Sequence, residues 1–566
     1  MLAYLVFNMQ SVNFILKKKN FFQKKSIFIT DTIHLNNLLR QNKLNSVCIE
    51  QEITTDLKNF LLNKHYERIN KKLKILGKKN IIIINNKKFN TLYYNFRGLA
   101  GRIFVGIKLK LFSLKKIINL RKIKRICYLN DYEDKLFDNK FFFLLLKIFC
   151  KKNNLGLENL KLEKIQIKNF KWQFKKIFLN LVYLLKNLSY SKIIIIIKKK
   201  LSYFSFSKKH FLIIEPALDI QYSNFNLFKT IFFKIKSEYS TNKIDQNKLK
   251  IDNFMNLFYS YLLEKNKILN DLTVKKILSF KKKIKNKNIQ IFWSQGPELE
   301  NRSFFYFLKK NYIVNGVQHG GKQLIMKNRE IINKDFEYAF CNKYFSYGIS
   351  KIFKKKKFGL SKGLVNLGCM KAKYDHKDLE FSSKNKNNIL YVPISLSSLT
   401  YPTFEILANY KYADQLSACK YLNNQKFLKP FVKIIPNIKF NNNFIDENSL
   451  IFNPIYFKLK QFKKIKECSS SIINEIKKKK PRIIFFDSFS TPVYQSLLSQ
   501  SEIIVLKDKN TLFQKDALML LKKRIHFISD IQKLNDTIRG ILKNKNLKAG
   551  NNQFYETFYK QQGKLF

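Results

Sequence analysis

Short apolar runs alternate with longer amphipathic stretches along most of this 566-residue chain. A run of about four to eight apolar residues between polar ones predicts a buried strand, and a longer stretch with a helical period predicts a helix. In the first 240 residues the predicted strands are 26–30, 45–50, 81–84, 192–197 and 211–217. The predicted helices there are 56–76 and 141–152. This alternation indicates an α/β layer.

The middle of the chain continues the pattern with a strand–helix–strand unit. Strands 289–294 and 312–317 flank a predicted helix at 298–310, and strands 343–348 and 364–369 follow. Residues 222–288 are Lys-rich with a helical period, which predicts helices packed outside the sheet. We therefore expect residues 1–381 to form one N-terminal α/β domain that carries this helical insert.

The last third alternates strands and helices with short connections. The predicted strands are 389–392, 431–436, 482–486, 502–506 and 525–528. The predicted helices are 403–424, 457–466, 491–498, 513–524 and 531–545. This predicts a linker at 382–388, a second domain at 389–550, and a tail at 551–566 that folds back on the first domain. The expected fold class is α/β, with two doubly wound, Rossmann-like domains that face each other across a cleft.

The stretch 312–322, Y-I-V-N-G-V-Q-H-G-G-K, places polar residues where a strand ends. Histidine is the side chain best suited to move a proton near neutral pH, which makes His319 the candidate base. Gly320 and Gly321 allow a positive φ or the close approach of a ligand. The preceding strand ends in Gln295 and Gly296, at the same predicted carboxyl edge. Gln318 and Glu330 complete the candidates for this side of the cleft.

A second candidate half-site lies at 487–492, D-S-F-S-T-P. Ser490 or Thr491 is placed to cap the following helix, with Pro492 in its first turn. Free N–H groups and the positive end of a helix dipole favour a pyrophosphate there. Asp487 and Lys433 are further candidates for this donor side.

Other chemistries fit the sequence less well. Residues 316–322 spell G-x-x-x-x-G-K, but Gln323 replaces the Ser or Thr of a P-loop and no Walker-B strand follows. No G-x-S-x-G motif accompanies His319, whose structural alternative is a histidine that caps a turn. Residues 97–102, R-G-L-A-G-R, are interpreted as a turn, and the acidic stretch 131–134 as a chance match to a metal-binding triplet. No metal or other cofactor is expected.

The formal charge of +69 suggests nucleic acid, but the composition argues otherwise. Eleven of the 108 basic residues are Arg, the lysines are dispersed, and Asn, Ile and Phe abound, as an AT-rich coding sequence would produce. Phosphate and base recognition favours Arg, so no specific nucleic-acid partner is expected. A non-catalytic basic protein that binds a polyanion or an anionic membrane surface stays open as the alternative function.

Cysteine usage and hydropathy point to the cytoplasm. The seven cysteines are scattered without a C-x-x-C, which predicts reduced thiols. The N-terminal stretch lacks a signal-peptide pattern, and the longest apolar runs are far too short to span a bilayer. We expect a cytoplasmic protein that can also contact the inner face of the membrane peripherally.

The block 291–371 resembles a known family. Its motifs W-S-Q-G-P-E-L-E-N, G-V-Q-H-G-G, Glu330, F-S-Y-G and L-G are similar to those of transferases of surface-carbohydrate biosynthesis. These are relatives of the CDP-glycerol glycerophosphotransferases and of capsule glycosyltransferases with a GT-B fold. The resemblance continues through I-L-Y-V-P, F-V-K-I-I-P and F-F-D-S-F-S-T-P-V-Y-Q-S-L to about residue 510.

This resemblance implies transfer of a glycosyl or polyol-phosphate group to a carbohydrate acceptor, including a lipid-linked one. The donor would be a nucleotide sugar or a CDP-alcohol, held by the second domain. The base would be His319, and Ser490 and Thr491 would contact the donor phosphates. The chain departs from the family at Lys322-Gln323, where Tyr-Gly is usual, and at Gln495, where a Glu is usual. The first 280 residues carry no resemblance.

Overall fold

The chain forms several parallel sheets covered by helices in a computed structural model. The structure describes residues 1–7, 9–18, 22, 26–79, 81–84, 87–129, 139–160, 211–215, 230–234, 244, 248–284, 288–294, 296–318, 320, 325–327, 334–348, 360, 362–369, 379, 385–394, 396–397, 408–434, 451–452, 455–509 and 511–560. The predicted strand 192–197 and the acidic stretch 131–134 lie outside these ranges.

Three parallel sheets organise the described residues. The first, in spatial order, is β3 (Ser46–Cys48), β2 (Ile27–Thr30), β1 (Leu2–Val6), β6 (Arg125–Leu129) and β7 (Gly156–Leu160). The second is β13 (Gly363–Asn366), β12 (Lys343–Ser346), β11 (Ile313–Val317), β10 (Gln290–Ser294), β8 (Phe211–Glu215) and β9 (Thr230–Lys234). The third is β18 (Lys466–Cys468), β16 (Lys429–Lys433), β14 (Asn385–Val392), β19 (Pro481–Phe486), β20 (Glu502–Leu506) and β21 (Ile525–Ile528).

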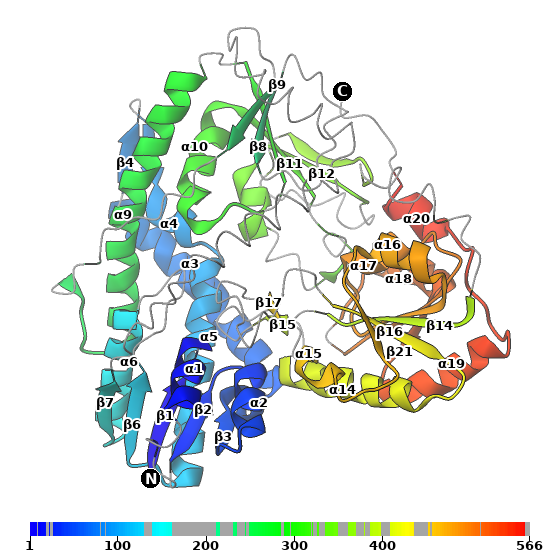
Figure 1. The fold of residues 1–566 in the computed structure, drawn as a ribbon. Helices are drawn as coiled ribbons and strands as arrows, with labels where there is room; N and C mark the ends of the chain where they lie inside the picture. The colour runs from blue at the N-terminus through cyan, green and yellow to red at the C-terminus, as the bar shows by residue number, and fades with distance from the viewer. Residues whose placement is uncertain are drawn as a thin grey trace, which may run out of the picture.

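Each sheet reverses its strand order once, so the α/β, doubly wound fold class is confirmed. The third sheet has the Rossmann order: β16 and β18 lie on one side of β14, and β19, β20 and β21 lie on the other. Two antiparallel pairs complete the described strands: β4 (Ile81–Ile84) with β5 (Lys87–Asn90), and β15 (Leu396–Ser397) with β17 (Ile451–Phe452). In Figure 1 the first sheet runs from blue to cyan, the second is green, and the third runs from yellow-green to orange.

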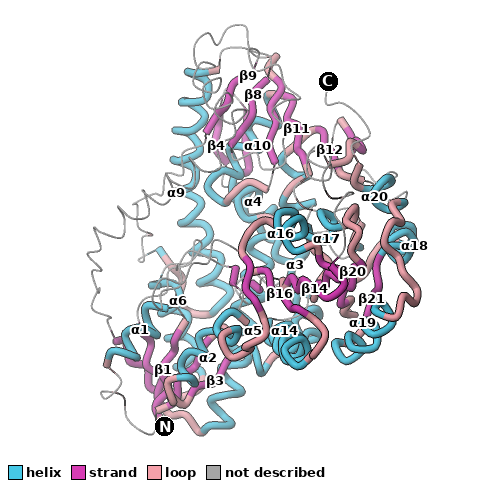
Figure 2. Tube along the Cα trace, turned by 45° about the vertical axis from the view of Figure 1, so that its right-hand side comes forward, coloured by secondary structure: helices cyan, strands magenta, loops and turns pink. Residues whose placement is uncertain are grey.

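Helices cover the sheets, as the tube view shows (Figure 2). Those before the third sheet are α1 (Met9–Lys17), α2 (Ile33–Gln41), α3 (Thr55–Leu76), α4 (Thr91–Phe96), α5 (Leu99–Arg121), α6 (Asn139–Lys152), α9 (Phe254–Lys283) and α10 (Arg302–Asn311). Those around the third sheet are α14 (Ala408–Asn424), α15 (Tyr456–Leu459), α16 (Ile472–Lys479), α17 (Thr491–Ser496), α18 (Lys515–Arg524), α19 (Leu534–Leu542) and α20 (Gln553–Phe558). Among the described helices, none has the length and apolar character needed to cross a bilayer.

The apolar runs become strands buried on both faces. In β19, Ile484 and Phe486 join one hydrophobic cluster while Ile483 and Phe485 join another on the opposite face. All five residues of β20 are buried. Burial on both faces explains why these segments are continuously apolar rather than alternating.

Several sequence predictions need revision. Residues 1–381 contain two parallel sheets, and the stretch expected to be wholly helical, 222–288, includes strand β9. The run 81–84 pairs in an antiparallel hairpin outside the parallel sheets. Residues 99–102 belong to α5, so the predicted turn is limited to Arg97 and Gly98, and Gly98 has a φ of +70°. Strand β14 begins inside the expected linker. The helix predicted at 457–466 is the shorter α15, which ends at Leu459, and β18 begins at Lys466. The exact domain boundaries stay a prediction.

A buried carboxylate, that of Asp335, joins α3 and the end of α4 to the segment before β12 in the second sheet. Asp335 Oδ2 accepts hydrogen bonds from Tyr66 (2.8 Å) and Asn70 (3.2 Å) of α3. Its Oδ1 accepts from Arg97 Nε at 3.0 Å and pairs with the other guanidinium nitrogen at 2.5 Å. Nearby, the fully buried Arg302 donates to the carbonyls of Asn95 and Arg97. These bonds fix α3, α4 and α10 to the segment that leads into β12.

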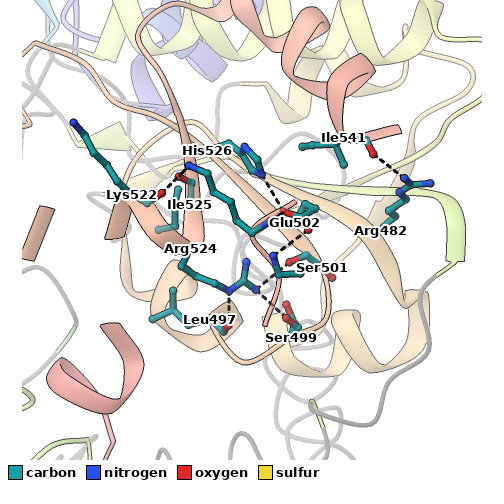
Figure 3. A network of polar contacts seen from close by, with 12 residues as sticks. Arg482, Leu497, Ser499, Ser501, Glu502, Lys522, Arg524, Ile525, His526 and Ile541 are labelled. Carbon is teal, nitrogen blue, oxygen red and sulfur yellow. Dashed lines mark hydrogen bonds and ion pairs between the residues drawn. The ribbon is translucent and has the colours of Figure 1, made fainter. Parts of the chain in front are cut away.

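A polar staple holds the amino edge of the third sheet (Figure 3). Glu502 lies 2.9 Å from His526 Nε2 and accepts from the backbone N–H groups of Lys548 and Ala549. Arg524 donates to the carbonyls of Leu497, Ser499 and Ser501. The staple fixes the end of the α17 segment and the residues that lead into α20.

We expect Asp335→Ala to destabilise the protein strongly. The substitution leaves the largely buried Arg97 without its carboxylate, and breaking a buried ion pair costs about 3–5 kcal/mol. Thermal unfolding measures the effect. The exposed pair Arg125–Glu158 provides the control, because Glu158→Ala should cost less than about 1 kcal/mol. Equal shifts for the two variants would contradict this account.

The Glu502 staple gives the stability a pH dependence. Burial acts to raise the pKa of Glu502, but hydrogen bonds from His526 and two backbone N–H groups outweigh it and lower the pKa below the ordinary 4.5. Its stabilisation is therefore present above pH 4.5 and lost as the pH falls through the lower, folded-state pKa. The difference in melting temperature between wild type and Glu502→Gln should shrink below that pH. A difference that grows on acidification would refute the assignment.

Candidate functional site

The turn after β11 is held by the side chain of Gln318. This residue is buried, and its backbone N–H donates to Phe345 O at 2.8 Å. Its amide Nε2 donates to Gly320 O at 2.8 Å, while Oε1 accepts from Tyr347 N at 2.9 Å. Gln318 therefore fixes the turn from within the protein, and its place among the residues of the cleft stays a prediction.

Gly320 brings this turn against the third sheet and its covering helices, which together are called the third sheet's lobe. Its φ of +82° suits glycine, and an ideal Cβ built there would lie 3.1 Å from Thr491 Oγ1. The two half-sites singled out in the sequence, about 170 residues apart, thus meet at this contact. His319, Gly321, Gln295 and Glu330 lie outside the described residues, so their roles stay predictions.

The neighbouring strand end serves packing. Gly296 follows β10, and an ideal Cβ at this position would lie 3.0 Å from Phe336 O. The glycine thereby lets the loop after β10 pack on the segment that contains Asp335 and Phe336. Ser294, the last residue of β10, is buried, and its hydroxyl has no hydrogen-bond partner among the described residues.

Asp487 has a structural role that corrects the donor contact expected from the sequence. It follows β19 and is fully buried. Its carboxylate accepts from Tyr391 OH (3.2 Å), Ile394 N (2.7 Å) and Gln415 Nε2 (2.8 Å). Burial raises its pKa, against the opposing effects of Lys411 and these hydrogen bonds. Asp487 ties the ends of β14 and β19 together, which is the point where the strand order reverses.

Ser490 and Thr491 lie at the start of the six-residue helix α17, shorter than the predicted 491–498. Ser490 has an extended backbone, and its side chain makes no capping hydrogen bond. The hydroxyl of Thr491 faces the Gly320 turn at the contact described above. A helix this short supplies little dipole, so its hydroxyl and N–H groups matter more than the helix macrodipole.

Lys433 ends β16, at the same carboxyl edge as the 487–491 segment. Burial lowers the pKa of its ammonium, and the nearby Cys468 and Glu475 act in the opposite direction. The side chain remains partly exposed. This position is compatible with the donor-side role predicted for it, which stays a prediction.

Sequence reasoning missed Lys411, the buried cation at this edge. Its Nζ donates to Asp487 O at 2.6 Å and lies 3.6 Å from Asp508 Oδ2. Burial, only partly offset by Lys411, raises the pKa of the neighbouring Asp414 to about 6. The sequence did contain a signal for a cation at this edge. Strands β19, β20 and β21 are each followed within two residues by an aspartate: Asp487, Asp508 and Asp530.

The described residues contain no candidate centre for metal or thiol chemistry. No group of three or more His, Cys, Asp or Glu side chains in these ranges is arranged to hold a metal ion. All seven cysteines are described, and each is a buried free thiol.

No protein-family model and no curated protein sequence matches the chain. Among solved structures, accessory secretory protein 1, 2 and 3 of Streptococcus pneumoniae is 11% identical, with 52% of this chain and 55% of that chain covered and a TM-score of 0.29. This chain thus spans about half of that chain's length.

Two other solved structures are matched over most of their length. Sucrose-phosphate synthase (tll1590) from Thermosynechococcus elongatus is 9% identical, with 62% of this chain and 95% of that chain covered and a TM-score of 0.35. A glycosyltransferase from Rickettsia africae ESF-5 is 13% identical, with the same coverages and a TM-score of 0.33. Such low scores add nothing to the α/β fold that the three parallel sheets themselves establish.

We predict that a side chain at position 320 would strain the contact between the Gly320 turn and Thr491. Alanine at a φ near +80° costs about 1–2 kcal/mol, and at Gly320 its methyl group would also crowd Thr491 Oγ1. Gly363 is the matched control, because its φ is +84° and its Cβ would meet nothing within 4 Å. Gly320→Ala should therefore lower the melting temperature more than Gly363→Ala.

Adding Thr491→Ala tests whether that excess comes from the contact. The Thr491→Ala substitution should remove the additional loss of melting temperature caused by Gly320→Ala. It should leave the loss caused by Gly363→Ala unchanged. Additive effects in both backgrounds would show that the two lobes do not meet at this point.

Proposed function

We propose that the chain transfers a glycosyl or polyol-phosphate group from a nucleotide-activated donor to a hydroxyl of a carbohydrate acceptor. The observation that carries the proposal is the meeting of the Gly320 turn and Thr491 at the carboxyl edges of two doubly wound sheets. Ligands of open α/β sheets bind at such edges. A donor on one sheet and an acceptor on the other would have their reacting atoms near this contact.

The proposed base is His319, the chain neighbour of Gly320. It would accept the proton of the acceptor hydroxyl as that oxygen bonds to the donor carbon or phosphorus and the bond to the nucleotide phosphate breaks. The proton would end on the imidazole and the electron pair on the departing nucleotide. Gln318 supports this assignment, because its three hydrogen bonds anchor the residue before His319.

The charge on the leaving nucleotide would be borne by groups on the third sheet. Ser490 and Thr491, at the start of α17, would donate hydrogen bonds to a phosphate. Lys433 would add a positive charge from the end of β16, which is separated from β19 by β14. Asp487 and Lys411 would act as positioning residues, since their bonds hold the strand ends on which the phosphate contacts depend.

Nucleotide release tests the proposal directly. Purified protein is incubated with a panel of nucleotide sugars and CDP-alcohols, with and without carbohydrate acceptors. We expect one donor class to release its nucleotide, and His319→Ala to slow that release by about 10²–10⁴-fold. Lys433→Met should weaken donor use without changing the melting temperature.

The controls separate chemistry from folding. Gly363→Ala, at the start of β13, where an added Cβ would meet nothing within 4 Å, should keep full activity. A His319→Ala protein that melts like the wild type but does not turn over supports the base assignment. Release that is unchanged in His319→Ala, or wild-type protein that uses no donor in the panel, would overturn the proposal.

A further inference from the structure

The β4–β5 hairpin presents apolar side chains on an uncovered face. Phe89 of β5 is buried and packs on Tyr306 and Phe307 of α10, with ring centroids 6.1 and 6.0 Å apart. Alternate residues of a strand point to opposite faces, so Ile81 and Ile83 lie on the other side, where they are 40% and 67% exposed. In Figures 1 and 2 this hairpin lies beside α9, away from the third sheet.

The same surface is strongly basic. Residues 68–90 contain eight Lys and Arg residues and no Asp or Glu. Its exposed basic side chains come from the end of α3, the turn and the hairpin: Arg68, Lys71, Lys72, Lys74, Lys78 and Lys88. Among them, Ile75 in the last turn of α3 is 53% exposed.

We propose that this hairpin and the end of α3 form a docking surface for an anionic lipid bilayer. The lysines would pair with headgroup phosphates, and Ile75, Ile81 and Ile83 would enter the interfacial region. A soluble polyanion would match the charge but leave these isoleucines in water, whereas a bilayer accommodates both kinds of side chain. Exposed apolar edges of this type are otherwise a liability that proteins avoid.

Vesicle co-sedimentation of the full-length protein tests the proposal. The vesicles are phosphatidylcholine alone, or phosphatidylcholine with added phosphatidylglycerol. One variant carries Ile81→Asp and Ile83→Asp, and another carries Lys71→Glu, Lys74→Glu and Lys78→Glu. We expect salt-sensitive binding to the anionic vesicles only, weakened about tenfold or more in each variant.

The matched control is Phe427→Asp. This residue is 82% exposed and has Lys426 and Lys429 nearby, but it follows α14 in the third sheet's lobe. Its variant should bind like the wild type. Thermal unfolding checks that each protein is folded, and Ile83→Ser replaces the double aspartate variant if that one does not fold.

Three outcomes would overturn the proposal: equal binding to neutral vesicles, equal loss in Phe427→Asp, or loss in the lysine variant with none in the isoleucine variants. The last outcome would instead indicate a surface for soluble polyanions. The measurement needs no donor, acceptor or turnover, so its result is independent of the transferase proposal.

Discussion

An isolated antiparallel bridge fixes how the second and third sheets meet. Met326 pairs with Phe513, Lys327 N donates to Leu512 O, and Gln514 N donates to Ile325 O, both at 2.8 Å. Ile325 and Met326 are buried in the same hydrophobic cluster as Phe489 and Val493 of the third sheet's lobe. Backbone pairing sets a register as well as a distance. The contact between the Gly320 turn and Thr491 depends on this register, and so does the proposed reaction geometry.

The third sheet was the most predictable part of the fold. Its strands are apolar on both faces, and the runs 482–486 and 502–506 are nearly the observed β19 and β20. Which strands share a sheet was not predictable, since pairing joins residues far apart in sequence. The runs 26–30 and 289–294 look alike, yet they belong to different sheets. Strand β18 was missed because two of its three residues are exposed, which removes the apolar signal.

The candidate site was predictable in its location more than in the role of each residue. A strand followed by Gln-His-Gly-Gly marks a carboxyl edge whatever the sheet, and so does a strand followed by Asp-Ser-Phe-Ser-Thr. Whether a carboxylate at such an edge faces solvent or the interior depends on neighbours from other strands and helices. Asp487 meets Tyr391 and Gln415, and no periodicity in the chain announces that meeting. The bonds from Gln318 to Gly320 O and Tyr347 N were not predictable from the sequence for the same reason.

The first sheet's unit also packs directly on the third sheet's lobe. Ile33 and Cys48 share a hydrophobic cluster with Tyr412 of α14, and α14 contacts the 3₁₀ helix η2 (Ile49–Glu52). Through α3 and Asp335, the same unit is bound to the second sheet. The two lobes are therefore coupled by a third body as well as by their own bridge. Close-packed surfaces resist separation but tolerate small sliding steps, so substrate entry would proceed through shear along α14 rather than through a wide hinge opening.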